Sequence, residues 1–532
     1  MASIIMDSDL LGFRISKHVS EKQYHEFQDV YTSLLEHRAK KWTRDILKVT
    51  GSSLRPPSRS AATKRLIRKG IPMEHRPLCW FEYSGARTLY DKEPLLYDFL
   101  VQLELQERKK ALRNSAKASR NSIASSNTDT ILGFIDMVDR DMCRTFPDNK
   151  HFRTSINSNP DFEAERVTKT LATLEYESQI EKWKYHVSRH YGHNPYLLAL
   201  RRVLVSFVFY SWPRHSDALA MCSYKIGYCQ SLNFIVGMLL LVFTHSTPET
   251  KRVFESSTDN DSFGLTIETK VFWMLVAIVE RLMPVEMYGC TLEGSLVQQE
   301  ILWSWIREHA SGRLNALSDH FDHLMRSNDS PVRRTFIKSA SSSAITNAGI
   351  SSSNSLSMIS TPWFMALFVN AVPTETVLRI WDCFFYQGEK ILFRVAMSLL
   401  EMHDATLSKL HEPSEIWTAV RDLPKTVIDC EEFIKACFSL NDDSPQRAAE
   451  KTDPIRKRDK PSSLLHPTRL TNSVHHDRAL SSSDVDSLLK PLAIIATDTN
   501  NQFKKITNAG ISEQRRKILE SLINKQQHSA GM

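Results

Sequence analysis

The sequence is poor in the features that mark several large classes of protein. Its 532 residues include only 16 glycines, which together with frequent leucine-rich helical patterns argues against an all-β fold. None of the eight cysteines forms a C-x-x-C pair, so a zinc ribbon or disulfide scaffold is not expected. The longest apolar run, residues 234–243, is too short to cross a bilayer. No basic region precedes an apolar core at the start. We therefore expect a soluble, cytoplasmic protein with reduced thiols.

The sequence also has no strong excess of charge of either sign. The net charge of +7 comes from 68 basic and 61 acidic residues, without the dense basic stripe that nucleic-acid binding requires. We expect no nucleic-acid partner. An acidic protein or an anionic membrane surface would suit this balance. With 42% hydrophobic residues, the chain can bury a large core, either in two or three domains or in one large helical domain with appendages.

The segment before Pro147 has the clearest helical pattern. Its apolar residues recur at three- and four-residue spacing, which predicts a helix with one buried face that proline then ends. These residues are Ile131, Phe134, Ile135, Val138 and Met142. Arg144 would lie near the helix end, and Asp141, three residues earlier, could pair with it and limit its rotamers. An ordinary surface ion pair is the alternative interpretation.

Two further blocks of sequence make it less probable that Asp141 and Arg144 form only a surface ion pair. One is Ile226-Gly227-Tyr228-Cys229-Gln230-Ser231-Leu232-Asn233-Phe234, and the other is Arg68-Lys69-Gly70-Ile71-Pro72 followed by Arg76 and Trp80. Together with the Arg144 segment, they resemble the signature blocks of the TBC-domain family of Rab GTPase-activating proteins, in the family's order. Residues 377–388, which include Trp381 and Asp382, resemble a late segment of the same domains.

The resemblance implies an all-α, two-lobed helical domain over residues 66–440. Residues 1–65 would be a helical extension, with one or two helices over about 21–49 and a linker over 51–60. A serine-rich stretch at about 327–360 interrupts the domain and predicts a disordered insertion, because its composition buries too little apolar surface. Residues 247–264 read as a polar loop. Residues 441–532 would form a mostly disordered tail with an amphipathic helix at 511–524, which could dock on the domain or bind a partner.

The resemblance also implies roles for single residues. Arg144 would be an arginine finger, and Gln230 would position the attacking water, both acting in trans on a partner Rab. The remaining residues are expected to support the site, to contact the GTPase or to build the fold. Asp141 would orient Arg144; Tyr228 would pack or hydrogen-bond beneath Gln230; Asn233 would support the site; Arg76 would be structural or contact the GTPase; Trp80, Trp381 and Asp382 would be structural.

The implied protein is a GTPase activator rather than an enzyme in its own right. Its partner would be a GTP-bound Rab, through which it would regulate vesicle trafficking and could be recruited peripherally to endomembranes. GTP and Mg²⁺ would belong to the partner, so no cofactor and no metal site are expected in this chain. One residue departs from the family pattern, because Ser231 stands where glycine usually follows the glutamine. If that position requires a positive φ, serine would strain it.

Two other functions remain open. A catalytically silent scaffold would bind a Rab without accelerating hydrolysis, although such a protein need not keep both Arg144 and Gln230. A metal-dependent hydrolase is suggested by His186, His190 and His193, the first two one helical turn apart. That H-x-x-x-H pattern lacks the glutamate that zinc proteases use as a base.

Overall fold

Helices make up nearly all of the regular structure. The computed structural model describes residues 8–46, 48–50, 53–104, 106, 131–153, 194–212, 226–256, 262–284, 287–289, 292–309, 354–410, 412–439 and 510–518. Within these ranges the strands form one short antiparallel hairpin, β1 (Lys48–Thr50) with β2 (Ser53–Arg55). The prediction of an all-α fold is thereby confirmed.

The N-terminal segment differs from its prediction in one respect. Helix α1 (Glu21–Lys41) begins at a capping box in which Ser20 and Gln23 satisfy each other's backbone N–H groups. A π-helical turn (Trp42–Ile46) follows it, and the hairpin then replaces both the end of the predicted helix and part of the predicted linker. The helix stops early because β1 pairs with β2, with Val49 opposite Leu54.

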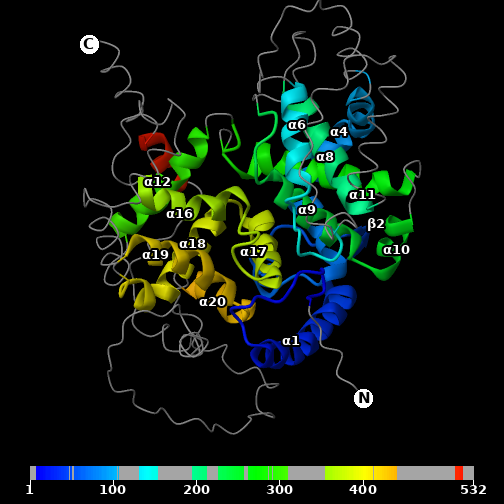
Figure 1. The fold of residues 1–532 in the computed structure, drawn as a ribbon. Coiled ribbons are helices and arrows are strands. Elements are labelled where there is room, and N and C mark those ends of the chain that lie inside the picture. Colours follow the sequence, from blue (N-terminus) through cyan, green and yellow to red (C-terminus); the bar gives the residue numbers. More distant parts are fainter. Residues whose placement is uncertain are drawn as a thin grey trace, which may run out of the picture.

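One group of helices contains the Arg144 segment and the sequence blocks around Gly70 and Gln230 (Figure 1). Helix α9 lies within this group and packs against α8 and α11. Of its residues, all but Phe234 are buried, which fits a helix that is apolar on every side. The helices of this group are α2 (Ala61–Lys69), α3 (Arg76–Tyr83), α4 (Ala86–Lys92), α6 (Ile131–Met142), α8 (Pro195–Ser211), α9 (Leu232–Thr244), α10 (Pro248–Ser256) and α11 (Ser262–Ala277), which continues into a π-helical turn (Ile278–Leu282).

The second group lies beside the first, with α17 between them (Figure 1). Helix α17 packs against α2 and α3 on one side and against α18 and α20 on the other. This arrangement matches the two-lobed fold that was predicted. The second group consists of α12 (Glu293–His309), α16 (Asn354–Met365), α17 (Thr374–Gln387), α18 (Lys390–Leu407), α19 (Pro413–Asp422), a 3₁₀ turn (Leu423–Thr426) and α20 (Cys430–Ser439).

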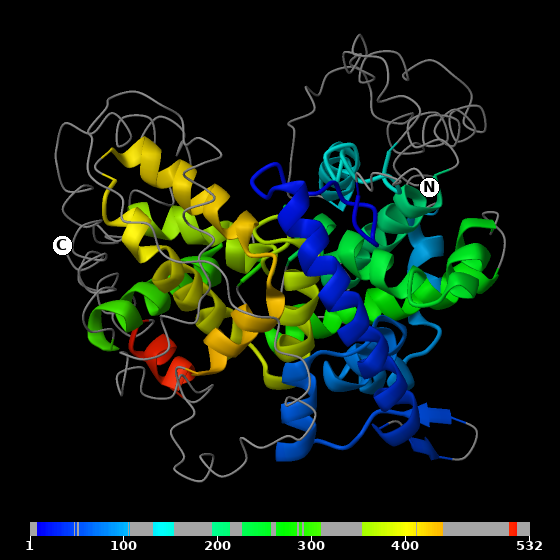
Figure 2. The ribbon, with the colours of Figure 1, turned by 90° about the horizontal axis from the view of Figure 1, so that it is seen from below.

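Helix α1 lies across one face of the domain and contacts the second group (Figure 2). The Tyr31 hydroxyl donates to Glu375 on α17 at 2.8 Å. Arg38 donates from both terminal nitrogens to the Glu431 carboxylate on α20, each at 2.7 Å. These contacts join the N-terminal extension to the body of the domain.

The predicted loop over 247–264 is wrong, because α10 occupies half of it and α11 begins within it. Thr247 caps this helix by accepting from the Thr250 N–H at 3.0 Å. Phe254 is buried and packs against the Tyr196 ring, with ring centroids 5.0 Å apart. A short surface helix buries only a narrow stripe, so its composition resembles that of a loop.

The serine-rich insertion and the tail are described only at their edges. Residues 327–353 and 440–509 lie outside the described residues, as do 519–524 of the predicted terminal helix. Helix α16 begins at Asn354, so the predicted insertion extends too far. Ser360 is buried, and its hydroxyl donates to Gln299. From the serine-rich composition alone, this hydroxyl was expected to face solvent. Residues 510–518 form a helix that docks on the domain, with Ile511 buried and Gln514 donating to the Ser304 hydroxyl at 2.7 Å.

Among the described residues, no helix combines the length and the apolar character that a bilayer crossing requires. No disulfide joins the cysteines within those same ranges.

Candidate functional site

Arg144 lies in a turn directly after α6. The Arg144 N–H donates to the Asp141 carbonyl and the Thr145 N–H to the Met142 carbonyl, both at 3.1 Å, so the helix tightens as it ends. Phe146 then takes a positive φ of 50°, which no helix continues. The side chain of Arg144 is 63% exposed, and its guanidinium donates to Asp141 Oδ1. The ion pair expected from the three-residue spacing is present.

Asp141 connects Arg144 to the second sequence block. Its side chain is only 6% exposed, and its other oxygen, Oδ2, accepts from the Tyr228 hydroxyl at 2.7 Å. Burial, reinforced by the Asp141 charge, raises the pKa of Tyr228 well above its ordinary value, so the phenol stays a donor. The Tyr228 hydroxyl therefore bonds to Asp141, whereas the sequence had placed this side chain beneath Gln230.

A second chain of hydrogen bonds runs through Thr145. The Thr145 hydroxyl donates to the Asp141 carbonyl at 2.8 Å, and Asn233 Nδ2 donates to the Thr145 hydroxyl at 2.8 Å. Asn233 Oδ1 accepts from the Ser231 N–H at 3.2 Å. The turn after α6 is thus tied to the first turn of α9. The sequence analysis missed Thr145, since a threonine after an arginine carries no signal of its own.

Gln230 lies between two residues of this network, Tyr228 and Ser231, and its side chain is exposed. The loop that carries it requires unusual backbone geometry. Gly227 has a φ of 67°, and a Cβ there would lie 2.5 Å from a Phe134 ring carbon. Ser231 has a φ of 105°, so the condition under which serine strains this position is met.

The network therefore joins the turn that carries Arg144 to the loop that carries Gln230, and both side chains are exposed. A positive guanidinium and a neutral amide can respectively neutralise phosphate oxygens and hold a water molecule. Asp141, Tyr228 and Asn233 supply hydrogen bonds of this network.

Arg76 lies in a different environment, inside the junction between the two helix groups. It is 2% exposed and contacts Asp382 at 3.3 Å and Glu375 at 2.8 Å. Burial alone would lower its pKa, but the two carboxylates outweigh burial and raise it above the ordinary value. So enclosed a side chain cannot reach a partner protein. Of the two roles expected for Arg76, the structural one fits this position.

The other motif residues surround the same carboxylate. Asp382 accepts from Trp80 Nε1 at 2.9 Å and from the Ile71 N–H at 3.0 Å. Trp381 is buried and donates to the Leu367 carbonyl at 2.9 Å. These contacts agree with the structural roles expected for Trp80, Trp381 and Asp382. His186, His190 and His193 lie outside the described residues.

The family model described as the Rab-GTPase-TBC domain matches residues 217–408. The chain is 28% identical over 410 residues to the GTPase-activating protein GYP3 of Saccharomyces cerevisiae, covering 76% of this chain and 51% of that protein. It is 27% identical over 433 residues to the Growth hormone-regulated TBC protein 1 of Homo sapiens, covering 81% of this chain and 89% of that protein. It thus spans about half the length of the yeast relative.

Among solved structures, the Chlamydomonas flagellar RabGAP TBC domain aligns with a TM-score of 0.45 and 21% identity, covering 81% of this chain and 98% of that domain. The family match includes Gln230 and helix α17, while Arg76 and Arg144 precede it in the chain. Residues 217–408 of this chain thus match the Rab-GTPase-TBC domain, and the chain is similar to a yeast GTPase-activating protein and to a human TBC protein.

Proposed function

We propose that this chain accelerates GTP hydrolysis by a GTP-bound Rab GTPase, with Arg144 and Gln230 inserted in trans. The observation that carries the proposal is the network beneath these two side chains. Asp141 and Asn233 fix the segments of Arg144 and Gln230 to each other, while both side chains remain exposed. Two exposed polar groups on one rigid base are what an activator needs in order to enter a partner's nucleotide site.

Arg144 would neutralise charge that develops on the transferred phosphoryl group. A guanidinium has five N–H donors, so Arg144 can keep Asp141 on one edge and offer the other donors to phosphate oxygens. In Ras-type systems an inserted arginine is worth about 10³ to 10⁵ in rate, and we take this range as the benchmark. Lysine has the charge but lacks the planar fork, so it should not replace Arg144.

Gln230 would hold the attacking water in place of a glutamine of the GTPase. Its amide accepts a hydrogen bond through oxygen and donates one through nitrogen, so it can orient a water molecule between two partners. The hydrogen bond between Asn233 and the Ser231 N–H fixes the backbone next to Gln230. A glutamate of equal size would lose the donor, and an alanine would lose both groups.

The reaction requires nothing from this chain beyond these side chains. GTP and Mg²⁺ would be bound by the Rab, and any membrane contact would be peripheral and made through it. By accelerating hydrolysis, the chain would end the active state of its Rab and so regulate vesicle trafficking on the membrane where that Rab is found.

The test is single-turnover GTP hydrolysis by a panel of purified Rabs with wild-type protein, Arg144→Ala, Gln230→Ala and Gln230→Glu. Arg140→Ala is a matched control, because Arg140 is an exposed arginine in the last turn of α6, four residues before Arg144. We expect one or a few Rabs to respond, the Arg144 and Gln230 variants to lose the stimulation, and Arg140→Ala to keep it.

The silent scaffold predicts a different pattern, in which a Rab binds in its GTP form but its hydrolysis rate is unchanged. Equal stimulation by wild type and both alanine variants would contradict the assignment of Arg144 and Gln230, even if a Rab partner were found. Binding of the GTP-loaded Rab is therefore measured alongside hydrolysis for each variant.

A further inference from the structure

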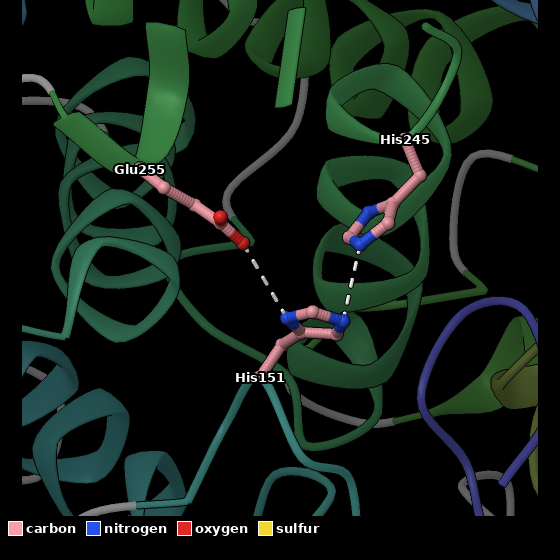
Figure 3. Close-up of side chains that lie close together, drawn as sticks. All are labelled: His151, His245 and Glu255. Atoms are coloured by element: carbon pink, nitrogen blue, oxygen red, sulfur yellow. Dashed lines mark hydrogen bonds and ion pairs between the residues drawn. The ribbon is translucent and has the colours of Figure 1, made fainter. Parts of the chain in front are cut away.

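Two histidines and a glutamate meet at one place near the surface, away from the motifs considered so far (Figure 3). His151 follows the turn after α6, His245 caps the end of α9, and Glu255 lies on α10. One ligand atom from each residue can be chosen so that all three lie within 4.8 Å of one another. No sequence motif marked this cluster, because His151 lies 94 residues before His245.

The hydrogen bonds of His245 fix which of its nitrogens carries a proton. Nδ1 lies 2.9 Å from the Leu241 carbonyl oxygen, which can only accept, so Nδ1 is the donor. In a neutral ring, Nε2 then has a lone pair and no hydrogen. This lone pair points at His151 Nε2, 3.1 Å away (Figure 3).

His151 consequently faces an acceptor on each side of its ring. Its Nε2 faces the His245 lone pair at 3.1 Å, and its Nδ1 faces the Glu255 carboxylate at 3.6 Å. A neutral imidazole has one N–H and cannot serve both. One of these two acceptors therefore receives no hydrogen bond from His151.

We propose that His151, His245 and Glu255 bind a single Zn²⁺ ion or a chemically similar divalent transition-metal ion. Imidazole nitrogen and carboxylate oxygen are established zinc ligands. Two ligands around a tetrahedral zinc lie about 3.3 Å apart, close to the 3.1 Å between the two Nε2 atoms. Glu255 is 38% exposed, so its carboxylate can move to the third position, and water can take the fourth.

The surroundings already hold the ligands as metal sites usually do. The Leu241 carbonyl fixes the tautomer of His245. The Tyr196 hydroxyl donates to Glu255 Oε1 at 3.0 Å. Asn194 Nδ2 donates to the His151 carbonyl at 2.9 Å and Asn149 Oδ1 accepts from the His151 N–H at 2.9 Å. The contacts of His151 and His245 place these two ligands before any ion arrives, which lowers the entropic cost of binding.

Two nearby lysines disfavour binding of the ion. Lys251 Nζ lies 3.9 Å from Glu255, and Lys150 is close enough to lower the pKa of both histidines. Their charges repel a divalent cation and compete for Glu255, so the affinity should increase when Lys251 is removed. This variant offers a test that breaks no ligand and no buried contact.

A bound ion would connect segments that also carry the proposed fingers. His151 lies seven residues after Arg144, and His245 ends the helix that begins just after Gln230. The ion would take no part in hydrolysis. It would join the turn after α6 to the far end of α9 and to α10. The expectation that the chain holds no metal would then be wrong outside the catalytic site.

The test is calorimetric titration of Zn²⁺ into metal-free full-length protein, with the Co²⁺ visible spectrum as a second readout. We expect one Zn²⁺ per chain, and a tetrahedral Co²⁺ spectrum without the thiolate charge-transfer bands that cysteine ligands would give. Glu255→Gln removes a ligand and should weaken binding at least as much as the roughly 10- to 100-fold typical of losing an outer-shell partner, and His151→Gln or His245→Gln should weaken it at least as much. His25→Gln, which removes an exposed histidine on α1, should change nothing, while Lys251→Ala should tighten binding.

Thermal unfolding of each variant without metal separates lost ligation from lost folding, since Zn²⁺ should raise the Tm of the wild type but not of a folded histidine variant. The proposal is overturned if Zn²⁺ binding is absent, if it survives in the double variant His151→Gln/His245→Gln, or if Lys251→Ala weakens it.

Discussion

Two arginines of the signature blocks, Arg76 and Arg144, both pair with an aspartate, yet they lie in opposite environments. Arg76 is enclosed between the helix groups, where Asp382 and Glu375 take its donors and Asp382 also accepts from Trp80 and Ile71. Arg144 lies at the surface, where Asp141 holds one edge of a guanidinium that is 63% exposed.

The difference shows how one side chain serves two purposes. A buried arginine with two carboxylates is bound to the fold and has nothing left to offer a partner. An exposed arginine held by one carboxylate has a limited choice of rotamers but retains most of its donors. Both residues are arginines, so the proposed finger differs from the structural arginine in its exposure and in its number of partners.

The largest expected effect tests the exposed arginine. Arg144→Ala should reduce the stimulated rate of GTP hydrolysis by the Rab about 10³- to 10⁵-fold. This loss corresponds to about 4–7 kcal/mol in the barrier. Arg144→Lys should lose most of the same stimulation. Because the Arg144 guanidinium is 63% exposed and Asp141 keeps the Tyr228 hydroxyl as a donor, the free energy of unfolding should change by no more than about 1 kcal/mol. Single-turnover kinetics and urea unfolding of the same samples measure the two effects. A large loss of stability would mean that Arg144 is structural.

The next effect tests the buried arginine. Arg76→Ala should lower the free energy of unfolding by about 3–5 kcal/mol, because Asp382 would be left as a buried charge with only the more distant Arg379, 4.0 Å away, as a cationic partner. Urea unfolding measures this change, with Arg144→Ala as the control. If Arg76→Ala were stable and yet inactive toward a Rab, the structural role assigned to Arg76 would be wrong.

A smaller effect is expected at the link between the two blocks. Tyr228→Phe removes the hydrogen bond to Asp141 and should cost about 1–3 kcal/mol of stability. Stimulated hydrolysis should fall, but less than in Arg144→Ala, since the finger itself remains. Tyr210→Phe is a suitable control, because that hydroxyl donates to Glu280 at 2.8 Å on another helix. Equal loss of stimulation in both variants would argue against a specific role for the Asp141 contact.

The smallest effect concerns Ser231. Its φ of 105° lies in a region that glycine adopts without strain, so Ser231→Gly should stabilise the protein by up to about 1 kcal/mol. Ser408→Gly is the control, because Ser408 has an ordinary φ of −67°, and this substitution should destabilise. Urea unfolding compares the two, and a destabilised Ser231→Gly would show that the serine side chain has a stabilising contact of its own.

The sequence predicted what depends on local periodicity and on motif residues. The apolar spacing before Pro147 predicted α6, the uninterrupted apolar run predicted the buried α9, and the three-residue spacing predicted the pair of Asp141 and Arg144. Each of these is a property of one helix or one turn, so no distant residue is needed to infer it.

The sequence did not predict what depends on distant contacts. Thr145 gains its role from Asn233, 88 residues away, and His151 gains its partner from His245, 94 residues away. The hydroxyl of Tyr228 donates to Asp141 because the fold places this buried carboxylate within hydrogen-bond distance. Helix α10 was taken for a loop because its buried stripe is narrow, although Thr247 followed by Glu249 could have indicated a helix start.

The most direct test of the central claim is whether Arg144 contacts the charge that develops during hydrolysis. A responsive Rab loaded with GDP and aluminium fluoride mimics the transferring phosphoryl group, and binding of this complex is compared with binding of the Rab loaded with GDP alone. The account predicts that wild type and Arg140→Ala prefer the fluoride complex strongly, and that Arg144→Ala loses this preference while remaining folded. An equal preference in Arg144→Ala and wild type would contradict the account.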